Sequence, residues 1–219
     1  MSTASVRPPT TTEAVLDAVR RMLVTGEIAP GSPVRQEALA EQLGVSRVPL
    51  REALKVLEGE GSVRYLPRRG YVASELSVDD LVEVYRLREL LEAEAIRVAV
   101  PRLTSTDLAA LAAAAADVDA AGSAGDLGAM TVANRQFHFL LFDAAAMPRL
   151  SRTLRQLWDA TDVYRSVYFA GVTNRRRVRH EHRALLAALR SGDAEAAVAA
   201  QHAHRANSVT AVTAALGRR

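Results

Sequence analysis

Three histidines lie at positions where a helix would turn them toward the interior of a bundle. Apolar residues recur at three- and four-residue intervals around His138, His182 and His204, which is the spacing of one helix face. A single inward histidine is usually a hydrogen-bonded core residue. Three of them on three helices fit a metal site built from facing helices. Nitrogen and oxygen ligands without sulfur suit zinc, nickel, manganese or iron, and the pattern does not choose among them.

Two further polar residues share these inward stripes. Asn134 lies one helical turn before His138, so both side chains should face the same interior. Arg88 stands in an apolar stripe between Val84 and Leu91. A buried arginine must pair either with a neighbour such as Glu92, one turn further on, or with an anionic ligand. Both interpretations stay open at this point.

A second group of residues is basic and lies early in the chain. Arg47, Arg51 and Lys55 recur at four-residue intervals and therefore form one ridge on a helix. A short helix with such a ridge can enter the major groove of DNA, where arginine pairs with guanine O6 and N7. The alternative is a solvated basic face on a small helical domain.

The elements that carry this ridge are short and separated by turn residues. The sequence predicts a helix from Thr11 or Thr12 to Met22, a second over Gln36 to Leu43, and a third capped by Ser46 that ends near Glu60. Two strands are expected at 62–66 and 70–74. The turn between them offers cations to phosphates or a minor groove, and a glycine that permits close approach: Arg68, Arg69 and Gly70.

Long helical periodicities replace these short elements after residue 75. We expect a domain with a helix-turn-helix and a hairpin at 1–75 and an antiparallel all-α bundle at 76–219, so the fold is mainly α. The turns between the bundle helices are short. The six predicted helices run approximately over 78–100, 105–121, 126–146, 148–170, 174–191 and 193–216.

Composition excludes several classes of protein. The chain has 219 residues, of which 49% are hydrophobic and 24% charged, so a disordered chain is excluded. The alanine-rich run Leu108 to Ala116 is too short to span a membrane, and we expect neither a membrane segment nor a secretory signal. Without cysteine there is no disulfide or thiolate site. The expected compartment is the cytoplasm. The net charge is only +3, so local clusters of charge matter more than the total.

The first third of the chain resembles the winged helix of GntR-type bacterial regulators. The resemblance rests on Pro30-Gly31, Leu39 to Arg47, Pro49 to Leu54, and Pro67 to Val72. It implies that Arg47 and Arg51 contact operator DNA, while Gly70 approaches it at the tip of the wing. Some members have a basic residue at the position of Glu37, and Arg35 is the candidate to replace it as a phosphate contact. The full set of expected DNA contacts is Arg35, Ser46, Arg47, Arg51, Lys55, Arg68, Arg69 and Gly70.

The remaining two-thirds resembles the FCD effector-binding domain of the FadR-type branch. The residues that carry this resemblance are Tyr85 to Glu92, Asn134 to His138, Glu181-His182 and His204. The resemblance implies a divalent transition metal held by Asn134, His138, His182 and His204. Asn134 replaces the usual aspartate, so the site lacks that charge and metal affinity should be lower. The resemblance also implies a small carboxylate effector, for which the candidate contacts are Arg88, Gln201 and Ser208.

Together these features predict a ligand-responsive transcriptional regulator that is not an enzyme. A homodimer would bind an inverted-repeat operator in double-stranded DNA, because the symmetry of the protein is mirrored in the half-sites. From the resemblance to this family, we expect the DNA-bound protein to repress transcription and the effector to relieve that repression. One alternative is a metal-dependent enzyme fused to a DNA-binding head, although no inward carboxylate stands out as a general base. The other is a bundle that senses metal alone or only dimerises.

Overall fold

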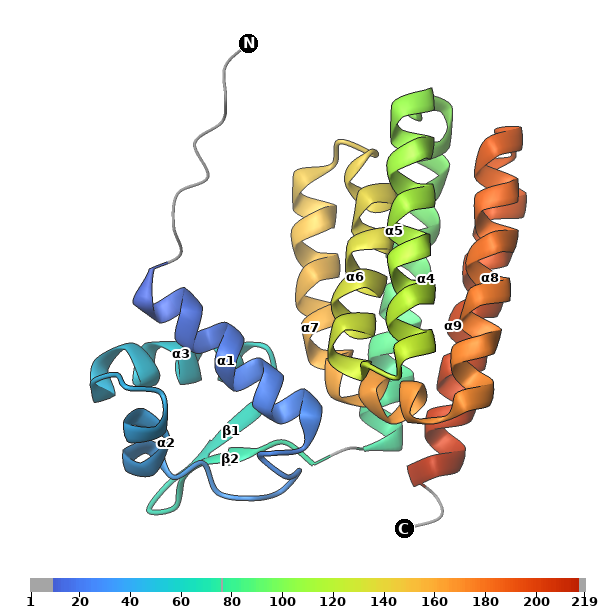
Figure 1. The fold of residues 1–219 in the computed structure, drawn as a ribbon. Helices are drawn as coiled ribbons and strands as arrows, with labels where there is room; N and C mark the ends of the chain where they lie inside the picture. Colours follow the sequence, from blue (N-terminus) through green and yellow to red (C-terminus); the bar gives the residue numbers. More distant parts are fainter. Residues whose placement is uncertain (1–9, 76, 217–219) are drawn as a thin grey trace. The chain divides into compact units, whose positions relative to one another are not determined.

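The computed structural model describes residues 10–75 and 77–216. They divide into two compact units, Met1–Glu75 and Leu76–Arg219. The first unit is a small helical domain with one hairpin, and the second is a bundle of long helices (Figure 1). The fold is therefore mainly α, as the sequence predicts.

The first unit has the element order of a winged helix. Helix α1 (Thr11–Thr25) is followed by α2 (Gln36–Gln42) and α3 (Arg47–Gly59), and then by strands β1 (Val63–Leu66) and β2 (Gly70–Ala73). The strands are antiparallel, with Val63 opposite Ala73 and Leu66 opposite Gly70. A single bridge from Pro33 to Val72 ties the segment before α2 to the same hairpin.

Helices α1 and α3 pack against each other and form most of the core of this unit. The apolar residues of each helix recur with the helical period and therefore form one face, so α3 packs against α1 along its length. The buried residues of these two helices are Val15, Val19, Met22, Leu23, Leu50, Ala53, Leu54 and Leu57.

Two predictions about helix ends need correction here. The cap of α1 is Thr10 rather than Thr11 or Thr12, because its side chain accepts a hydrogen bond from the Glu13 amide while the Glu13 carboxylate bonds back. This reciprocal capping box satisfies two amides that the helix itself leaves free. Ser46 does occupy the position before α3, but its side chain makes no capping hydrogen bond.

Over residues 77–216, the second unit consists of six long helices and one short 3₁₀ turn. The ranges are α4 (Val78–Ala99), η1 (Val100–Arg102), α5 (Ser105–Ala124), α6 (Leu127–Asp143), α7 (Pro148–Ala170), α8 (Val172–Ser191) and α9 (Ala194–Leu216). Helix α4 packs against α6, α7 and α9, while α5 packs against α6 and α8. The long helices run side by side with short turns between them (Figure 1).

Several ends of these helices differ from the predicted ones by two or three residues. Helix α5 continues through Gly122 to Ala124 and ends only at Gly125, whose φ of 75° is left-handed. Helix α6 ends at Asp143, three residues before Ala146, which has a φ of 55°. A residue with left-handed backbone angles cannot continue a right-handed helix. These helix ends are therefore set by the backbone conformation at Gly125 and Ala146, which the amino-acid composition alone does not predict.

The interior of the bundle combines aromatic rings with a polar centre. Trp158, Phe137, Phe142 and Phe169 are all fully buried, and the ring centroids of the first three lie 5.0 to 6.0 Å from that of His138. Within the described residues, no helix has the length and apolar character needed to cross a membrane.

Candidate nucleic-acid interface and candidate metal centre

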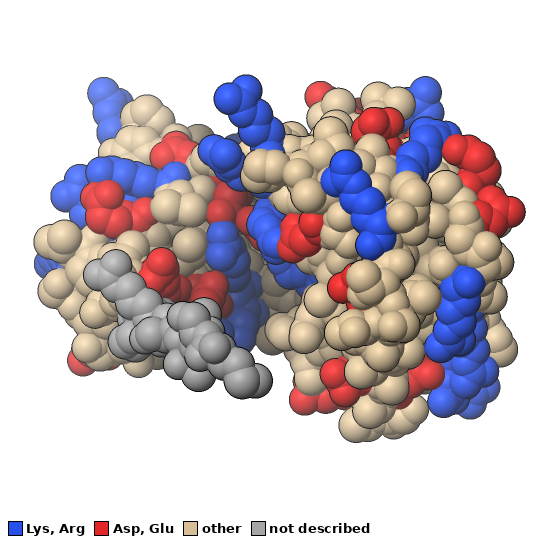
Figure 2. Space-filling view, turned by 90° about the horizontal axis from the view of Figure 1, so that it is seen from above, with Lys and Arg blue, Asp and Glu red and all other residues tan. Residues whose placement is uncertain are grey.

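The outer face of α3 carries the predicted basic ridge. Arg47, Arg51 and Lys55 are all exposed, on the side of α3 opposite its buried leucines. Amphipathic spacing produces this arrangement, since the apolar residues fix one face against α1 and leave the other free. On the surface shown in Figure 2, basic side chains are interspersed with acidic ones. The ridge is thus a local feature of α3.

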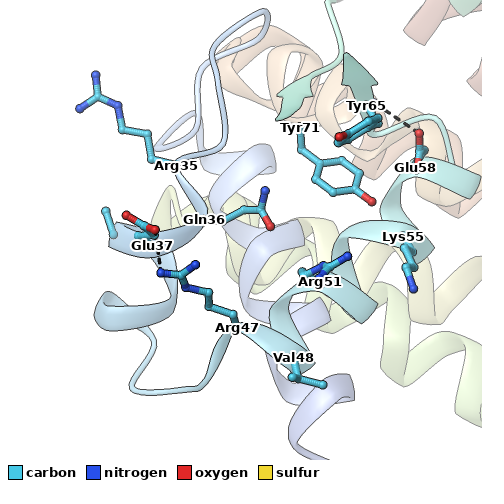
Figure 3. Close-up of a pocket in the computed structure, with 11 residues that line it drawn as sticks. Arg35, Gln36, Glu37, Arg47, Val48, Arg51, Lys55, Glu58, Tyr65 and Tyr71 are labelled. Carbon is cyan, nitrogen blue, oxygen red and sulfur yellow. Dashed lines mark hydrogen bonds and ion pairs between the residues drawn. The ribbon is translucent and has the colours of Figure 1, made fainter. Parts of the chain in front are cut away.

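The ridge lines one side of a groove that α2 and the hairpin complete (Figure 3). Several of these lining residues are not predicted from sequence spacing, because they approach the ridge only through the packing of the hairpin beside α3. The tyrosines are examples: Tyr65 and Tyr71 come from the two strands, and their rings meet edge to face with centroids 5.3 Å apart. The groove is lined by Arg35, Gln36, Glu37, Ala38, Arg47, Val48, Arg51, Lys55, Glu58, Tyr65 and Tyr71.

Carboxylates partner two of the three cations of the ridge. Arg47 Nη2 lies 2.7 Å from Glu37 Oε1, and Lys55 Nζ lies 2.9 Å from a carboxylate oxygen of Glu52. Arg51 makes no hydrogen bond or ion pair with another described residue. Exposed ion pairs of this kind contribute little free energy, so a phosphate or base can replace the carboxylate at small cost.

The turn of the hairpin projects two further arginines. Arg68 and Arg69 are exposed there, and Arg68 adopts a left-handed φ of 67°. Gly70 follows with a φ of 75°, a conformation in which any side chain would be strained. Arg35 directly precedes α2 and is also exposed, but in Figure 3 it points away from the ridge. Arg35 nevertheless lines the same groove as the ridge, whereas Arg68, Arg69 and Gly70 are not among its lining residues.

The three predicted histidines meet in the centre of the bundle. His138 on α6, His182 on α8 and His204 on α9 have ring centroids 5.1 to 5.2 Å apart. One ring nitrogen from each lies within 4.8 Å of the others. All three side chains are buried. Helices far apart in sequence thus bring three possible metal ligands to one point.

Several buried polar atoms in and next to this cluster lack hydrogen-bond partners among the described residues. Both ring nitrogens of His138 and of His182 have no hydrogen-bond partner, and neither does Oδ1 of buried Asn134. Burial lowers the pKa of His138 and of His182 well below the usual value, and the neighbouring imidazole of His204 lowers both further. Neutral imidazoles are the form that binds a metal. Unpaired buried nitrogens and an amide oxygen are therefore a donor set that a transition metal fits.

A carboxylate that we did not predict to be functional contacts the ring of His204. Glu181 Oε2 lies 2.6 Å from His204 Nδ1, and Glu181 Oε1 accepts a hydrogen bond of 2.7 Å from Asn207. The contact occupies Nδ1 and leaves Nε2 as the free ligand atom. Glu181 directly precedes His182 in sequence, but helix geometry turns it toward α9, so only the packing of α8 on α9 reveals this role.

Arg88 lies beside the histidines and pairs with Glu92. Arg88 Nε donates to Glu92 Oε1 at 2.9 Å, and Arg88 Nη1 donates to Thr161 at 3.1 Å. Glu92 also accepts hydrogen bonds from Trp158, Gln201 and Arg205, at 2.8 to 2.9 Å. Of the two possibilities for Arg88, the structure thus shows the pairing with Glu92.

The same network sets the protonation of its carboxylate. Burial by itself would raise the pKa of Glu92, but the guanidinium groups of Arg88 and Arg205 and the hydrogen bond from Gln201 hold it at about 2. The group is therefore ionised at neutral pH although it is fully buried.

Buried guanidinium groups lie against and near the ring of Trp158. The guanidinium groups of Arg88 and Arg165 each lie 4.2 Å from the Trp158 ring, and Arg205 is buried as well. Their carboxylate partners in this network are Glu92 and the half-buried Asp162. Burial lowers the pKa of Arg165, and Asp162 offsets this only in part. Arg88 and Arg205 thus share a single carboxylate, that of Glu92.

The other two predicted effector contacts lie on α9 near His204. Gln201 donates its amide to Glu92, while its carbonyl Oε1 is buried and has no partner. Ser208 is buried and donates to the backbone carbonyl of His204 at 3.2 Å. Gln201 therefore retains a free acceptor for a ligand.

Comparison with known proteins identifies both units. Residues 11–72 match the bacterial regulatory proteins of the gntR family, and residues 83–207 match the FCD domain. The chain is a GntR-family regulator with an FCD domain. GntR-family regulators are DNA-binding transcriptional regulators, and the groove along α3 belongs to the unit that matches their DNA-binding domain.

Several proteins that are similar in sequence to this GntR-family regulator are named as transcriptional regulators. The chain is 35% identical over 136 residues to the Nta operon transcriptional regulator of Aminobacter aminovorans, covering 62% of this chain and 64% of that protein. It is 33% identical over 140 residues to McbR of Escherichia coli, covering 64% and 63%. The matched stretch is thus less than two thirds of the length of either relative. The gluconate operon transcriptional repressor of Bacillus subtilis is 39% identical over 74 residues, which are 34% of this chain and 30% of the repressor.

A solved structure of E. coli McbR superimposes on nearly the whole GntR-family regulator. The TM-score is 0.84 at 26% identity, with 95% of this chain and 99% of the McbR chain covered. The similarity therefore extends over the helices that carry the histidine cluster as well as over the winged helix.

Proposed function

We propose that this GntR-family regulator is a homodimer that binds an inverted-repeat operator and changes its affinity when a metal-bound carboxylate effector occupies the bundle. The observation that carries the proposal is the cluster of His138, His182 and His204, three buried histidines around one point. A purely structural core would leave so many buried nitrogens unpaired only at considerable cost. The regulator acts in the cytoplasm, where operator DNA lies.

The DNA-reading half of the proposal rests on the geometry of the groove. Arg51 is the central cation of the ridge and has no competing carboxylate, so it is the leading candidate for base contacts. Arg47 and Lys55 flank it and would exchange their carboxylates for phosphates. The wing residues Arg68 and Arg69 would add phosphate or minor-groove contacts.

The metal-binding half assigns four ligands. His138, His182 and His204 would supply nitrogen, and Asn134 would supply its amide oxygen from one turn before His138. Glu181 would orient His204. The metal, when bound, supplies open coordination positions for the oxygens of an effector. Because Asn134 is neutral, the site attracts the cation less strongly than one containing aspartate.

The effector would be a small carboxylate because buried guanidinium groups lie beside the cluster, and two of them share one carboxylate. Arg88 and Arg165 flank Trp158 beside the cluster, and a carboxylate would balance their charge. The free carbonyl of Gln201 would accept a hydrogen bond from the same ligand, and Ser208 lies one turn after His204. An effector must favour one of two arrangements of the DNA-binding heads to alter operator affinity. We propose that the regulator represses transcription and that the effector relieves this repression.

Metal analysis combined with operator binding tests this proposal. The purified chain and its His138→Ala variant are analysed for transition metals before and after treatment with a chelator. We expect about one metal per wild-type chain and none in the variant, the stoichiometry of a single shared site. Wild-type chain without metal after reloading with zinc, nickel, manganese and iron would contradict the metal site.

Operator affinity then separates the remaining possibilities. Fluorescence anisotropy with a labelled operator is measured for metal-free and metal-loaded protein, with and without a panel of small carboxylates. We expect a carboxylate to change the affinity only when metal is present. An affinity that responds to metal alone would instead indicate a metal sensor. No response to either would indicate a bundle that serves dimerisation.

A further inference from the structure

Helix α4 exposes a row of residues on the side away from the core. Glu83, Leu87, Leu90, Glu94 and Arg97 follow each other at intervals of four, three, four and three residues, and all are exposed. That spacing forms one continuous stripe along a helix. Leu90 is 59% exposed and Leu87 is 44% exposed, and Arg86 lies beside them. We call this stripe with Arg86 the α4 face.

The charges on the α4 face are arranged symmetrically about Leu90. Seven positions before Leu90 lies Glu83 and seven after it lies Arg97; four positions before it lies Arg86 and four after it lies Glu94. Each pair has opposite signs. Two copies of α4 packed antiparallel about Leu90 would therefore place every one of these charges opposite its complement. A parallel arrangement would set like charges against each other, which is costly.

These complementary charges cannot meet within one chain. The rise along a helix separates Glu83 from Arg97 by about 21 Å and Arg86 from Glu94 by about 12 Å. Glu83 and Glu94 make no hydrogen bond or ion pair with any other described residue. Arg86 bonds the exposed Glu89, and Arg97 bonds Glu195 on α9, both in solvent-exposed contacts of small energy. Glu94 acts on Arg97, three positions further along α4, through charge alone. The face therefore holds two carboxylates without a hydrogen bond or ion pair to another described residue, and two exchangeable cations, around exposed leucines.

We propose that the α4 face is the interface with a second copy of this chain, packed antiparallel around Leu90. Leu90 would then meet Leu90 of the partner subunit on the two-fold axis, Arg86 would lie opposite Glu94 of the partner subunit, and Glu83 opposite Arg97 of the partner subunit. A surface that complements itself is the requirement for an isologous dimer. This inference rests on the dimer in the proposed function and assigns it a surface.

Cysteine cross-linking tests the central contact directly, because the chain contains no cysteine. A Leu90→Cys variant would bring two thiols together on the axis, where they can form a disulfide. We expect oxidation to convert it into a covalent dimer on a non-reducing gel. Val172→Cys, on α8 and similarly exposed at 54%, is the matched control and should stay uncross-linked. Equal, slow cross-linking of both variants would overturn the proposed contact.

Charge reversal tests the antiparallel register. Arg86→Glu alone and Glu94→Arg alone each place like charges opposite each other at two symmetric places, so sedimentation equilibrium should show the dimer dissociation constant rise by about tenfold or more. The double variant restores opposite charges and should return to within about threefold of wild type. Arg183→Glu, on the exposed side of α8, is the control and should have no effect. Absence of rescue in the double variant would overturn the register.

The outcomes also separate this inference from the proposed function. A Leu90→Arg variant places a charge at the centre of the face and should sediment as a monomer. If that variant stays dimeric while folded, the regulator dimerises through another surface, and only the α4 interface fails. If wild-type protein is itself monomeric when it binds operator, the proposed dimer fails as well. The metal site and the recognition helix are tested by variants that do not touch α4.

Discussion

Glu181 Oε2 lies 2.6 Å from Nδ1 of His204, at the back of the histidine cluster. Asn207 donates to the other oxygen of the same carboxylate, so the group is fixed from two sides. A carboxylate in this place sets the orientation of the ring and engages Nδ1, so that Nε2 is left as the ligand atom. The relationship gives His204 a defined ligand atom.

Replacing this carboxylate should weaken metal binding without removing a ligand. We expect Glu181→Gln to raise the metal dissociation constant by about 10- to 100-fold, the usual effect of losing such a partner. Competition with a chromophoric chelator measures it. Glu89→Gln provides a matched control, since Glu89 also contacts a histidine, the exposed His202, at 3.2 Å. Equal affinities for Glu181→Gln and wild type would contradict an orienting role.

Arg51 should decide operator recognition. Arg51→Ala removes the unpaired cation of the ridge, and loss of a bidentate contact with guanine should reduce operator affinity by about 10- to 100-fold. The melting temperature should stay within about two degrees because the side chain is exposed. Electrophoretic mobility shift and thermal melting measure the two effects. Arg64→Ala, exposed on β1, is the control, and retained operator affinity in Arg51→Ala would refute the assignment of the recognition helix.

The wing should contribute affinity without sequence readout. We expect Arg69→Ala to weaken binding to specific and random DNA by similar factors. The slope of log affinity against log salt concentration should become shallower by about one for each phosphate contact that is lost, that is, by about one for each DNA-binding domain of the dimer. Anisotropy titrations over a range of salt concentrations measure this slope. A loss confined to the specific operator would instead assign Arg69 to base readout.

Acid should destabilise the metal-free bundle through its histidines. Burial keeps the pKa of His138 and His182 well below the usual value, so below about pH 6.5 the unfolded chain binds protons that the folded chain does not. The free energy of unfolding should therefore fall with decreasing pH, by up to about 2.7 kcal/mol per pH unit for two protons. Urea unfolding in the presence of chelator measures the slope. His182→Phe should reduce it by about half, and an unchanged slope would contradict this origin.

Glu92 should be essential for the stability of the bundle. Glu92→Gln removes the charge that Arg88 and Arg205 share, leaving buried cations unpaired, and should lower the free energy of unfolding by about 3 to 5 kcal/mol. Asp117→Asn, on the exposed side of α5, is the control and should change it by less than about 0.5 kcal/mol. A small loss in Glu92→Gln would mean that solvent already reaches this network.

The sequence by itself determines the features that depend on the period of a helix. The positions of His138, His182 and His204 on inward stripes, and of Arg47, Arg51 and Lys55 on one ridge, follow from spacings of three and four residues within single helices. The order of short helices, a hairpin and then a bundle of long helices is predicted from local patterns as well, with errors of a few residues at helix ends.

The tertiary structure decides how residues far apart in sequence meet. Sequence spacing leaves Arg88 with a choice between Glu92 and a ligand, and only packing brings Trp158, Gln201 and Arg205 to that carboxylate. It likewise turns Glu181 from its neighbour His182 toward His204. Such contacts depend on which helices lie side by side and on their relative rotation, and local periodicity contains neither. The helices thus supply the groups, and their packing gives each group its partner.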